Sequence, residues 1–117
     1  MDPAIGPFLP LSPAALHILL SLAAGGRHGY GIMQEVSRQS EGQYKLGPGT
    51  LYDNLQKMMQ QGIVENAPNP VENDDPRRRY YRLTDFGRRL LSAEVIRLER
   101  IVHEARLQLR LPVPENS

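Results

Sequence analysis

The feature that most constrains this chain is an apolar repeat near its C-terminal end. Thr84 is a favourable helix N-cap residue and Pro112 ends helical structure, so the sequence predicts one helix that continues to about Arg110. Its apolar positions are separated by alternating steps of four and three residues, and they are Leu91, Val95, Leu98, Val102, Ala105 and Leu109. This spacing is typical of a helix that packs along another helix.

The length of this apolar seam favours a second copy of the chain as the partner. At 1.5 Å per residue the seam is about 28 Å long, which is more than the shorter helices upstream can cover. A chain of 117 residues without cysteine also has a small core and no disulfide to support it. We therefore expect residues 85–110 to form the dimerisation helix of a homodimer. Packing of the seam on the first helix of the same chain is the alternative.

Gly and Pro residues divide the preceding part of the chain into short elements. Three helices are expected, each bounded by Pro, Gly or capping residues: one from Ser12-Pro13 to Gly25-Gly26, one from 28–31 to about 40–42, and one from 47–49 to Gly62. The first of these is apolar on most faces, so it should be central or be covered by a second chain.

A β-hairpin is predicted after the third helix. Residues 63–66 and 79–83 have the composition of strands, and the loop between them contains prolines and acidic residues. Tyr80 and Tyr81 should point to opposite faces of their strand, one into the core and the other outward. The fold class that results is mainly α with a small β-hairpin: a winged helix-turn-helix followed by a long C-terminal helix.

The two ends of the chain are expected to lie outside this domain. Residues 1–11 contain three prolines and Gly6, which predicts a flexible N-terminal arm, although Ile5, Phe8 and Leu9 could instead dock on a surface. Residues 111–117 are expected to be a disordered tail. The domain itself is assigned to residues 12–84, with the dimerisation helix following at 85–110.

Charge is distributed unevenly although the formal net charge is only +1. Residues 65–75 contain four acidic residues and no cation, whereas residues 76–110 contain ten Arg and four acidic residues. Arg77, Arg78 and Arg79 lie at the base of the hairpin loop, where a winged helix meets DNA phosphates. On the third helix, which would enter the major groove, Gln56 and Lys57 lie on the polar face.

Three motifs in order carry a resemblance to a known family: His28-Gly29-Tyr30-Gly31-Ile32, Pro48-Gly49-Thr50-Leu51-Tyr52, and Arg79-Tyr80-Tyr81-Arg82-Leu83-Thr84. With these motifs, residues 11–110 resemble the PadR family of transcriptional regulators. The resemblance implies winged-helix homodimers, usually repressors, whose C-terminal helix pairs across the dimer and many of which respond to a small aromatic compound. It also implies DNA contacts from Thr50, Tyr52, Arg77, Arg78 and Arg79, to which we add Tyr30 of the first motif.

Two departures from the family pattern restrict what can be transferred. Gly31 stands where many members have a larger polar residue, and the sequence contains no Trp. Relatives that stack planar drugs on tryptophans at the dimer interface therefore give no template for an effector site in this chain.

Enzymatic, metal and membrane functions have little support in the sequence. His103-Glu104 begins like a zinc-protease motif, but Leu107 stands in place of the second His. Gly29 and Gly31 lack the third glycine of a dinucleotide-binding loop. We therefore expect no catalysis, no cofactor, no metal site and no membrane segment, and a cytoplasmic location.

The leading hypothesis is a homodimeric repressor that binds an inverted-repeat operator in double-stranded DNA and is released by a small aromatic ligand. The alternative is a winged-helix module that binds another protein and not DNA. Asp53 keeps this alternative open, because it places an acidic side chain beside Lys57 on the third helix.

Overall fold

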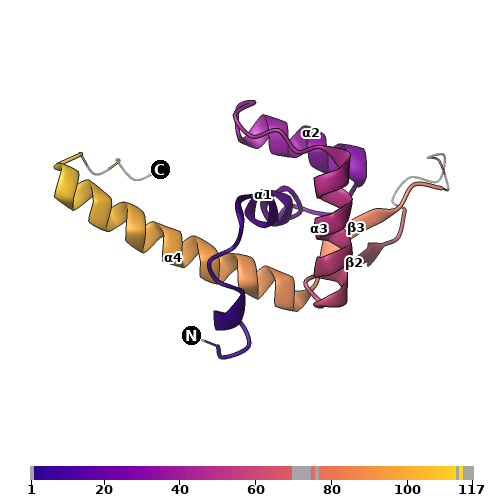
Figure 1. Ribbon diagram of the computed structural model, residues 1–117, viewed down its shortest axis with the longest axis horizontal. Helices are drawn as coiled ribbons and strands as arrows, with labels where there is room; N and C mark the ends of the chain where they lie inside the picture. The colour runs from indigo at the N-terminus through magenta and orange to yellow at the C-terminus, as the bar shows by residue number, and fades with distance from the viewer. Residues whose placement is uncertain (1, 70–74, 76, 113, 115–117) are drawn as a thin grey trace.

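The computed structural model describes residues 2–69, 75, 77–112 and 114. Three helices, α1 (Pro13–Ser21), α2 (Gly29–Gln39) and α3 (Pro48–Gln60), lie together at one end of the molecule. The long helix α4 (Asp85–Leu109) runs from this end and projects beyond the other helices (Figure 1). A short 3-10 helix, η1 (Gly6–Phe8), precedes α1.

The helix starts follow the capping residues in the sequence. The Ser12 Oγ accepts a hydrogen bond from the Ala15 N–H at 3.1 Å, and the Thr84 Oγ1 accepts one from the Gly87 N–H at 3.0 Å. Helix α3 ends before Gly62, whose φ of +73° is the left-handed conformation that glycine adopts most easily. The predicted positions of the four helices are confirmed, except that α1 ends at Ser21, a few residues before Gly25.

The β-sheet has one strand more than the predicted hairpin. Strands β2 (Val64–Ala67) and β3 (Tyr80–Leu83) form that hairpin, and β1 (Arg27–His28) pairs with the other edge of β3, so the order is β1-β3-β2. A strand of two residues is too short to produce a recognisable sequence pattern.

The extra strand changes the surroundings of the two tyrosines of β3. Tyr80 and Tyr81 are both buried, which differs from the expectation that one of them would point outward. Tyr81 belongs to the main hydrophobic core, and the ring of Tyr80 packs edge-on against His28 of β1, with the ring centroids 5.3 Å apart. Because β3 is the central strand, it has cover that a two-stranded hairpin would not provide.

Helix α1 is central, as its apolar faces indicate. Ile18, Leu19 and Leu22 have no exposed surface and pack among residues from every other helix. Their partners include Ile32 and Val36 of α2, Leu51 and Leu55 of α3, and Leu90 of α4.

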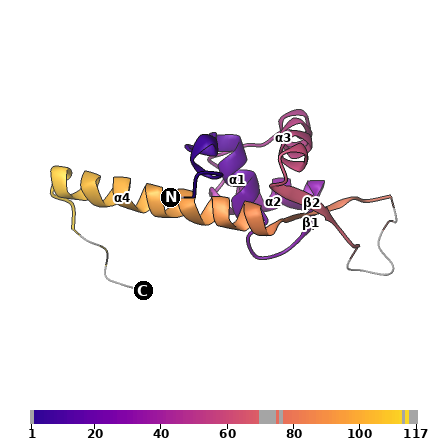
Figure 2. The same ribbon diagram turned by 90° about the horizontal axis from the view of Figure 1, so that it is seen from below.

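The N-terminal segment is packed on the domain and does not form the flexible arm expected for residues 1–11. Ile5 is buried in the core, and Phe8 meets Phe86 edge-on with the ring centroids 5.7 Å apart. The Leu11 N–H donates a hydrogen bond of 2.8 Å to the Glu94 carboxylate of α4. In the two views the N-terminal segment lies against α4 (Figures 1 and 2). Docking is favoured because the segment offers apolar side chains to the core and a backbone donor to a buried carboxylate.

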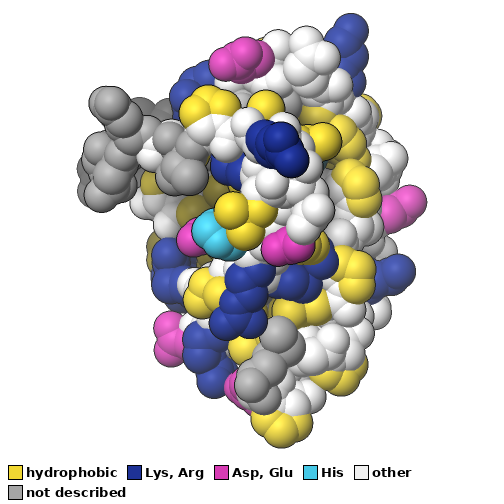
Figure 3. All heavy atoms as spheres, turned by 90° about the vertical axis from the view of Figure 1, so that its left-hand side faces the viewer, with side chains coloured by type: hydrophobic (Ala, Val, Ile, Leu, Met, Phe, Trp, Pro, Cys, Tyr) yellow, Lys and Arg dark blue, Asp and Glu magenta, His cyan; other side chains and the backbone are white. Residues whose placement is uncertain are grey.

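The predicted seam of α4 divides between two environments. Leu91 is buried in the core of its own chain, so it is unavailable to the dimer interface to which the heptad pattern assigned it. Leu98 is half-buried, whereas the other seam residues Val95, Val102, Ala105 and Leu109 are exposed. Figure 3 views the molecule from the side on which α4 projects, and hydrophobic side chains lie there among those of Lys and Arg.

Candidate nucleic-acid interface

A hollow of about 400 Å³ lies where the starts of α2 and α3 meet the base of the wing, the hairpin formed by β2 and β3. It is lined by His28, Gly29, Tyr30, Tyr52, Arg77, Arg78, Arg79 and Tyr81. Five of the eight residues that the sequence predicted to contact DNA are therefore brought to one place, although they come from three separate parts of the chain. These five are Tyr30, Tyr52, Arg77, Arg78 and Arg79.

The other three predicted residues lie on α3. Gln56 lines a neighbouring hollow of about 380 Å³, which shares Tyr52, Arg79 and Tyr81 with the first. Thr50 and Lys57 are exposed on α3 but line neither hollow. Leu51, Leu55 and Met58 occupy the buried side of the helix, so α3 presents a polar face outward.

Gly29 determines how closely Tyr52 can approach the start of α2. The phenol group of Tyr52 lies where a β-carbon at position 29 would be, so any larger residue there would collide with the hydroxyl and ring of Tyr52. Tyr52 is nevertheless 48% exposed, which leaves one side of its ring open to solvent. This close approach is a packing role of Gly29 that its place in a motif does not reveal.

His28 occupies a junction between α2 and the wing. Its Nδ1 accepts a hydrogen bond from the Gly31 N–H at 3.0 Å and so caps α2. Its Nε2 lies 3.3 Å from Nη1 of Arg78, a residue of the wing. The His28 ring is also parallel to that of Tyr30, with the planes 2° apart and the centroids 6.5 Å apart. Tyr30 itself is 61% exposed.

The cations of the wing differ in their surroundings. Arg77 forms an ion pair of 3.2 Å with Asp75, and Arg82 forms one of 2.8 Å with Glu65 on the neighbouring strand. Arg79 is exposed and lines both hollows. Within the acidic stretch at residues 65–75, residues 70–74 lie outside the described part of the chain.

Burial and charge act together on Tyr81, at the back of the hollow. Burial of the side chain is the main effect and raises the pKa of the Tyr81 hydroxyl, while the nearby Arg79 opposes the rise. Tyr81 is therefore a neutral wall of the site at neutral pH.

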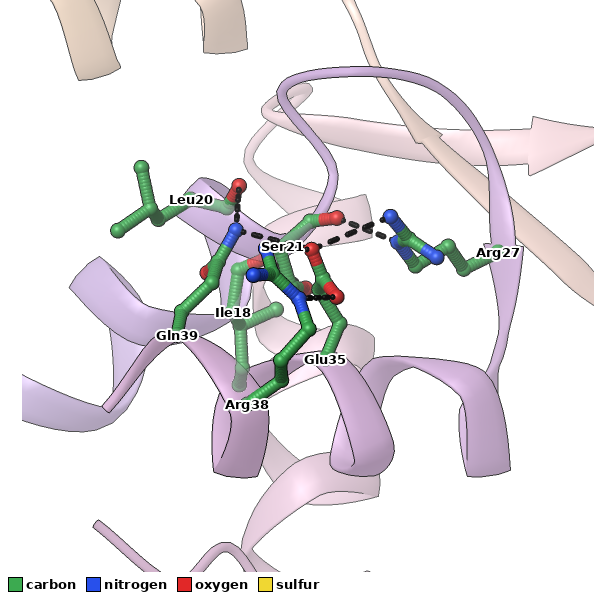
Figure 4. Close-up of polar contacts among 7 residues, drawn as sticks. All are labelled: Ile18, Leu20, Ser21, Arg27, Glu35, Arg38 and Gln39. Carbon is green, nitrogen blue, oxygen red and sulfur yellow. Dashed lines mark hydrogen bonds and ion pairs between the residues drawn. The ribbon is translucent and has the colours of Figure 1, made fainter. Parts of the chain in front are cut away.

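A polar network connects β1, which carries His28, with α2, which carries Tyr30 (Figure 4). The Glu35 carboxylate of α2 accepts hydrogen bonds from Arg38 at 2.7 Å and from Gln39 at 3.2 Å, and forms an ion pair with Arg27 of β1 at 3.4 Å. Arg27 Nε also donates to the Ser21 carbonyl of α1 at 2.7 Å. The hydrogen bond from Arg38 is the main reason that the pKa of Glu35 lies below its usual value. The network joins α1 and β1 to the second half of α2.

Other chemistry has little basis in the described part of the chain. No group of three or more His, Cys, Asp or Glu residues there is arranged to hold a metal ion. Among the described residues, no helix combines the length and the apolar composition that a bilayer span requires. His17 stacks on Tyr44, with the ring centroids 4.3 Å apart, so it is engaged in packing.

Comparisons with known proteins identify the family. Residues 18–93 match the family model described as the transcriptional regulator PadR-like family. The transcriptional regulator Rv3488 of Mycobacterium tuberculosis is 36% identical over 89 residues, which cover 76% of this chain and 78% of that protein.

Solved structures share the fold at lower sequence identity. A PadR-like transcriptional regulator from Bacillus cereus superposes with a TM-score of 0.69 at 18% identity, covering 84% of this chain and 92% of that one. Bacillus subtilis PadR in complex with operator DNA gives a TM-score of 0.65 at 21% identity, covering 92% of this chain and 53% of that one. The predicted winged helix-turn-helix fold is thereby confirmed, with a three-stranded sheet. The chain belongs to the PadR-like family of transcriptional regulators and is a regulator, not an enzyme.

Proposed function

We propose that this protein is a homodimeric repressor that binds an inverted-repeat operator through the hollow and the polar face of α3. The observation that carries the proposal is the convergence of Tyr30, Tyr52 and the cations Arg77–Arg79 around one open hollow. Guanidinium groups and phenol hydroxyls are common donors to DNA phosphates. They fix the position of a protein on the duplex, and contacts to the base edges supply specificity.

In this proposal α3 reads the bases. Its exposed side carries Thr50, Gln56 and Lys57, and the major groove is wide enough to admit a helix. Gln and Lys side chains can bond to the edges of adenine and guanine respectively. Thr50, on the first turn, would contact the backbone as α3 enters the groove.

The dimer in this proposal forms through the exposed half of α4. Val95, Val102 and Leu109 are exposed, and Leu98 is half-buried on the same side of the helix. A two-fold axis through this seam would place the two copies of α3 at half-sites about one helical turn apart. The proposal also includes release of the repressor from DNA by a small aromatic ligand, which the resemblance to PadR regulators implies. Since the proposed partner is DNA, the proposed place of action is the cytoplasm.

Salt dependence of DNA binding tests this proposal. Duplex DNA selected in vitro from random fragments would be titrated with the purified protein between 50 and 200 mM salt. We expect the affinity to fall steeply, by several fold for each phosphate that the protein neutralises. The selected sequences should also be inverted repeats. An affinity that stayed flat across this range would overturn the proposal.

Substitution of Tyr52 tests whether the hollow faces the DNA. Tyr52→Ala should weaken operator binding by about tenfold, since a lost contact of about 1.4 kcal/mol corresponds to that factor. It should leave the dimer intact, because Tyr52 lies on α3 and lines the hollow, outside the α4 seam. Tyr52→Phe keeps the ring beside Gly29 and removes only the hydroxyl, so its loss of affinity measures the part that the phenol donor contributes. Equal loss of dimerisation and DNA binding by Tyr52→Ala would assign Tyr52 to the core instead.

A second candidate function is supported by the acidic side chain on α3. Asp53 is exposed one turn from Lys57, and a carboxylate on this face would be repelled by DNA phosphates. A winged helix that binds another protein would tolerate such mixed charge. Pull-down of one stoichiometric protein partner, together with no salt-dependent binding of DNA, would favour this function over the first.

A further inference from the structure

We infer that His28 binds DNA directly, and that its Nε2–H and the guanidinium of Arg78 donate to the same backbone phosphate. This inference rests on the proposed function and makes it more specific. The contact would lie at the junction between the start of α2 and the base of the wing.

The hydrogen bond from Gly31 determines the tautomer of the His28 imidazole ring. The Gly31 N–H is a backbone donor, so the His28 Nδ1 that it contacts at 3.0 Å must be an acceptor without a proton. In a neutral imidazole with Nδ1 unprotonated, the proton is on Nε2. The capping bond of α2 thus makes Nε2 a hydrogen-bond donor.

Arg78 brings a second donor to the same point. A guanidinium group has five N–H donors and no acceptor. The 3.3 Å between Nε2 of His28 and Nη1 of Arg78 therefore joins two donors, which cannot satisfy one another. An acceptor placed between them would receive both hydrogen bonds, and a negative charge on that acceptor would strengthen the bond from Arg78.

The surroundings of this donor pair favour a phosphate over a neutral acceptor. Tyr30, Tyr52, Arg77 and Arg79 line the same hollow, so further phenol and guanidinium donors are at hand. A phosphate group has several acceptor oxygens and can use more than one donor at once. In DNA such a phosphate would be held between α2 and the wing.

His28 is also fixed in position before any ligand binds. Its backbone pairs with Tyr80 in the sheet, its ring packs edge-on against the Tyr80 ring at 5.3 Å, and its Nδ1 is used in the cap. Little side-chain freedom is left to lose, and a donor held in place in this way gains affinity by lowering the entropy cost of binding.

The test separates this contact from the capping role of His28. Asn is a strong N-cap residue, so His28→Asn should keep the hydrogen bond from Gly31 and remove the Nε2–H donor. We expect the melting temperature to stay near that of the wild type and affinity for the selected operator duplex to fall about three- to tenfold. His28→Ser, which also caps a helix, provides a second variant of the same kind.

The salt dependence of DNA binding distinguishes the contribution of His28 from that of Arg78. A neutral imidazole neutralises no phosphate charge, so His28→Asn should leave the slope of log affinity against log salt unchanged. Arg78→Gln, which removes a charge, should reduce that slope by about one. Because both donors share one acceptor, the double variant should lose less affinity than the product of the two single losses.

Duplexes with one phosphate replaced by a neutral methylphosphonate locate the acceptor. One position in each half-site should weaken the wild type by more than His28→Asn does, because both donors lose their charged acceptor there, and the variant should be less sensitive to that replacement than the wild type is. The inference is overturned if His28→Asn and His28→Ser bind as the wild type does, or if no position shows this loss of sensitivity. Failure of the proposed function is distinct, because the wild type itself would then show no salt-dependent binding.

Discussion

The two halves of α4 have the same secondary structure but very different surroundings. In the first half, Gly87, Leu90, Leu91 and Glu94 are buried against the winged domain. From Val95 onward no residue of the helix is buried within the described chain, and Val102 is 50% exposed. One apolar repeat therefore serves two purposes. Its first member completes the protomer, and its remaining members form an apolar surface of the kind that marks an interaction site.

The first half is held by backbone contact as well as by apolar packing. A β-carbon on Gly87 would collide with the carbonyl of Ile63, so the first turn of α4 lies directly against the chain that leads into β2. The Thr84 Oγ1 donates at 2.5 Å to the Gly62 carbonyl at the same place. The direction in which the exposed half projects is thus set by the winged domain, and with it the geometry of any dimer.

The largest expected effect is a loss of stability when Leu90, which has no exposed surface, is shortened. Leu90→Ala should lower the free energy of unfolding by about 2–5 kcal/mol, because it removes buried methyl groups and leaves a cavity. Leu107→Ala, in the exposed half, is the matched control and should change it by no more than about 0.5 kcal/mol. Urea unfolding of both variants measures the difference. Similar losses would contradict the division of α4 into a covered and an exposed half.

The sequence predicted the local elements well because their signals are local. Caps at Ser12 and Thr84 and the left-handed Gly62 each depend on a few neighbouring residues, and each is present in the structure. Of the predicted residues gathered at the hollow, Tyr30, Tyr52 and Arg79 belong to the motifs, and Arg77 and Arg78 belong to the Arg run at the base of the wing. The motifs did not predict the close approach of Tyr52 to Gly29, which brings α2 and α3 together.

The features that the sequence did not predict depend on contacts between distant parts of the chain. Strand β1 exists only because it pairs with β3, about fifty residues later. Ile5 is buried because the N-terminal segment packs on the core and on α4, where Phe8 contacts Phe86. The heptad pattern likewise placed Leu91 in the dimer seam, since spacing along a helix does not show where the domain stops covering it.

The next largest effect is expected on dimerisation, from a substitution in the exposed half of α4. Val102→Asp should weaken dimerisation by about 3 kcal/mol, more than a hundredfold, because it would place an uncompensated charge in the proposed seam. Monomers or unfolded chains are the expected products. Arg100→Asp introduces the same acid outside the seam and should leave the dimer intact. Light scattering over a range of protein concentrations distinguishes these outcomes, and an intact Val102→Asp dimer would exclude this seam as the interface.

The smallest effect is expected at Glu94, at the boundary between the two halves. Its carboxylate is only 1% exposed and accepts hydrogen bonds from Arg97 and from the Leu11 N–H of the N-terminal segment. Glu94→Gln keeps the shape of the side chain and removes its charge. It should lower the free energy of unfolding by about 1–3 kcal/mol, the range for hydrogen bonds to charged groups. Glu99→Gln, on the exposed surface of the same helix, is the control.

The pH dependence of stability tests the same carboxylate without relying on the size of that loss. The hydrogen bond from Arg97 is the main reason that the pKa of Glu94 is lowered in the folded chain, with burial acting in the opposite direction. A lowered pKa stabilises the fold at pH values above the unfolded pKa of about 4.3, and this stabilisation is lost as the pH falls through the folded pKa. Urea midpoints measured from pH 7 to pH 3 should therefore fall less steeply for Glu94→Gln than for the wild type or Glu99→Gln. Parallel curves for all three proteins would show that Glu94 does not couple the N-terminal segment to α4 through its charge.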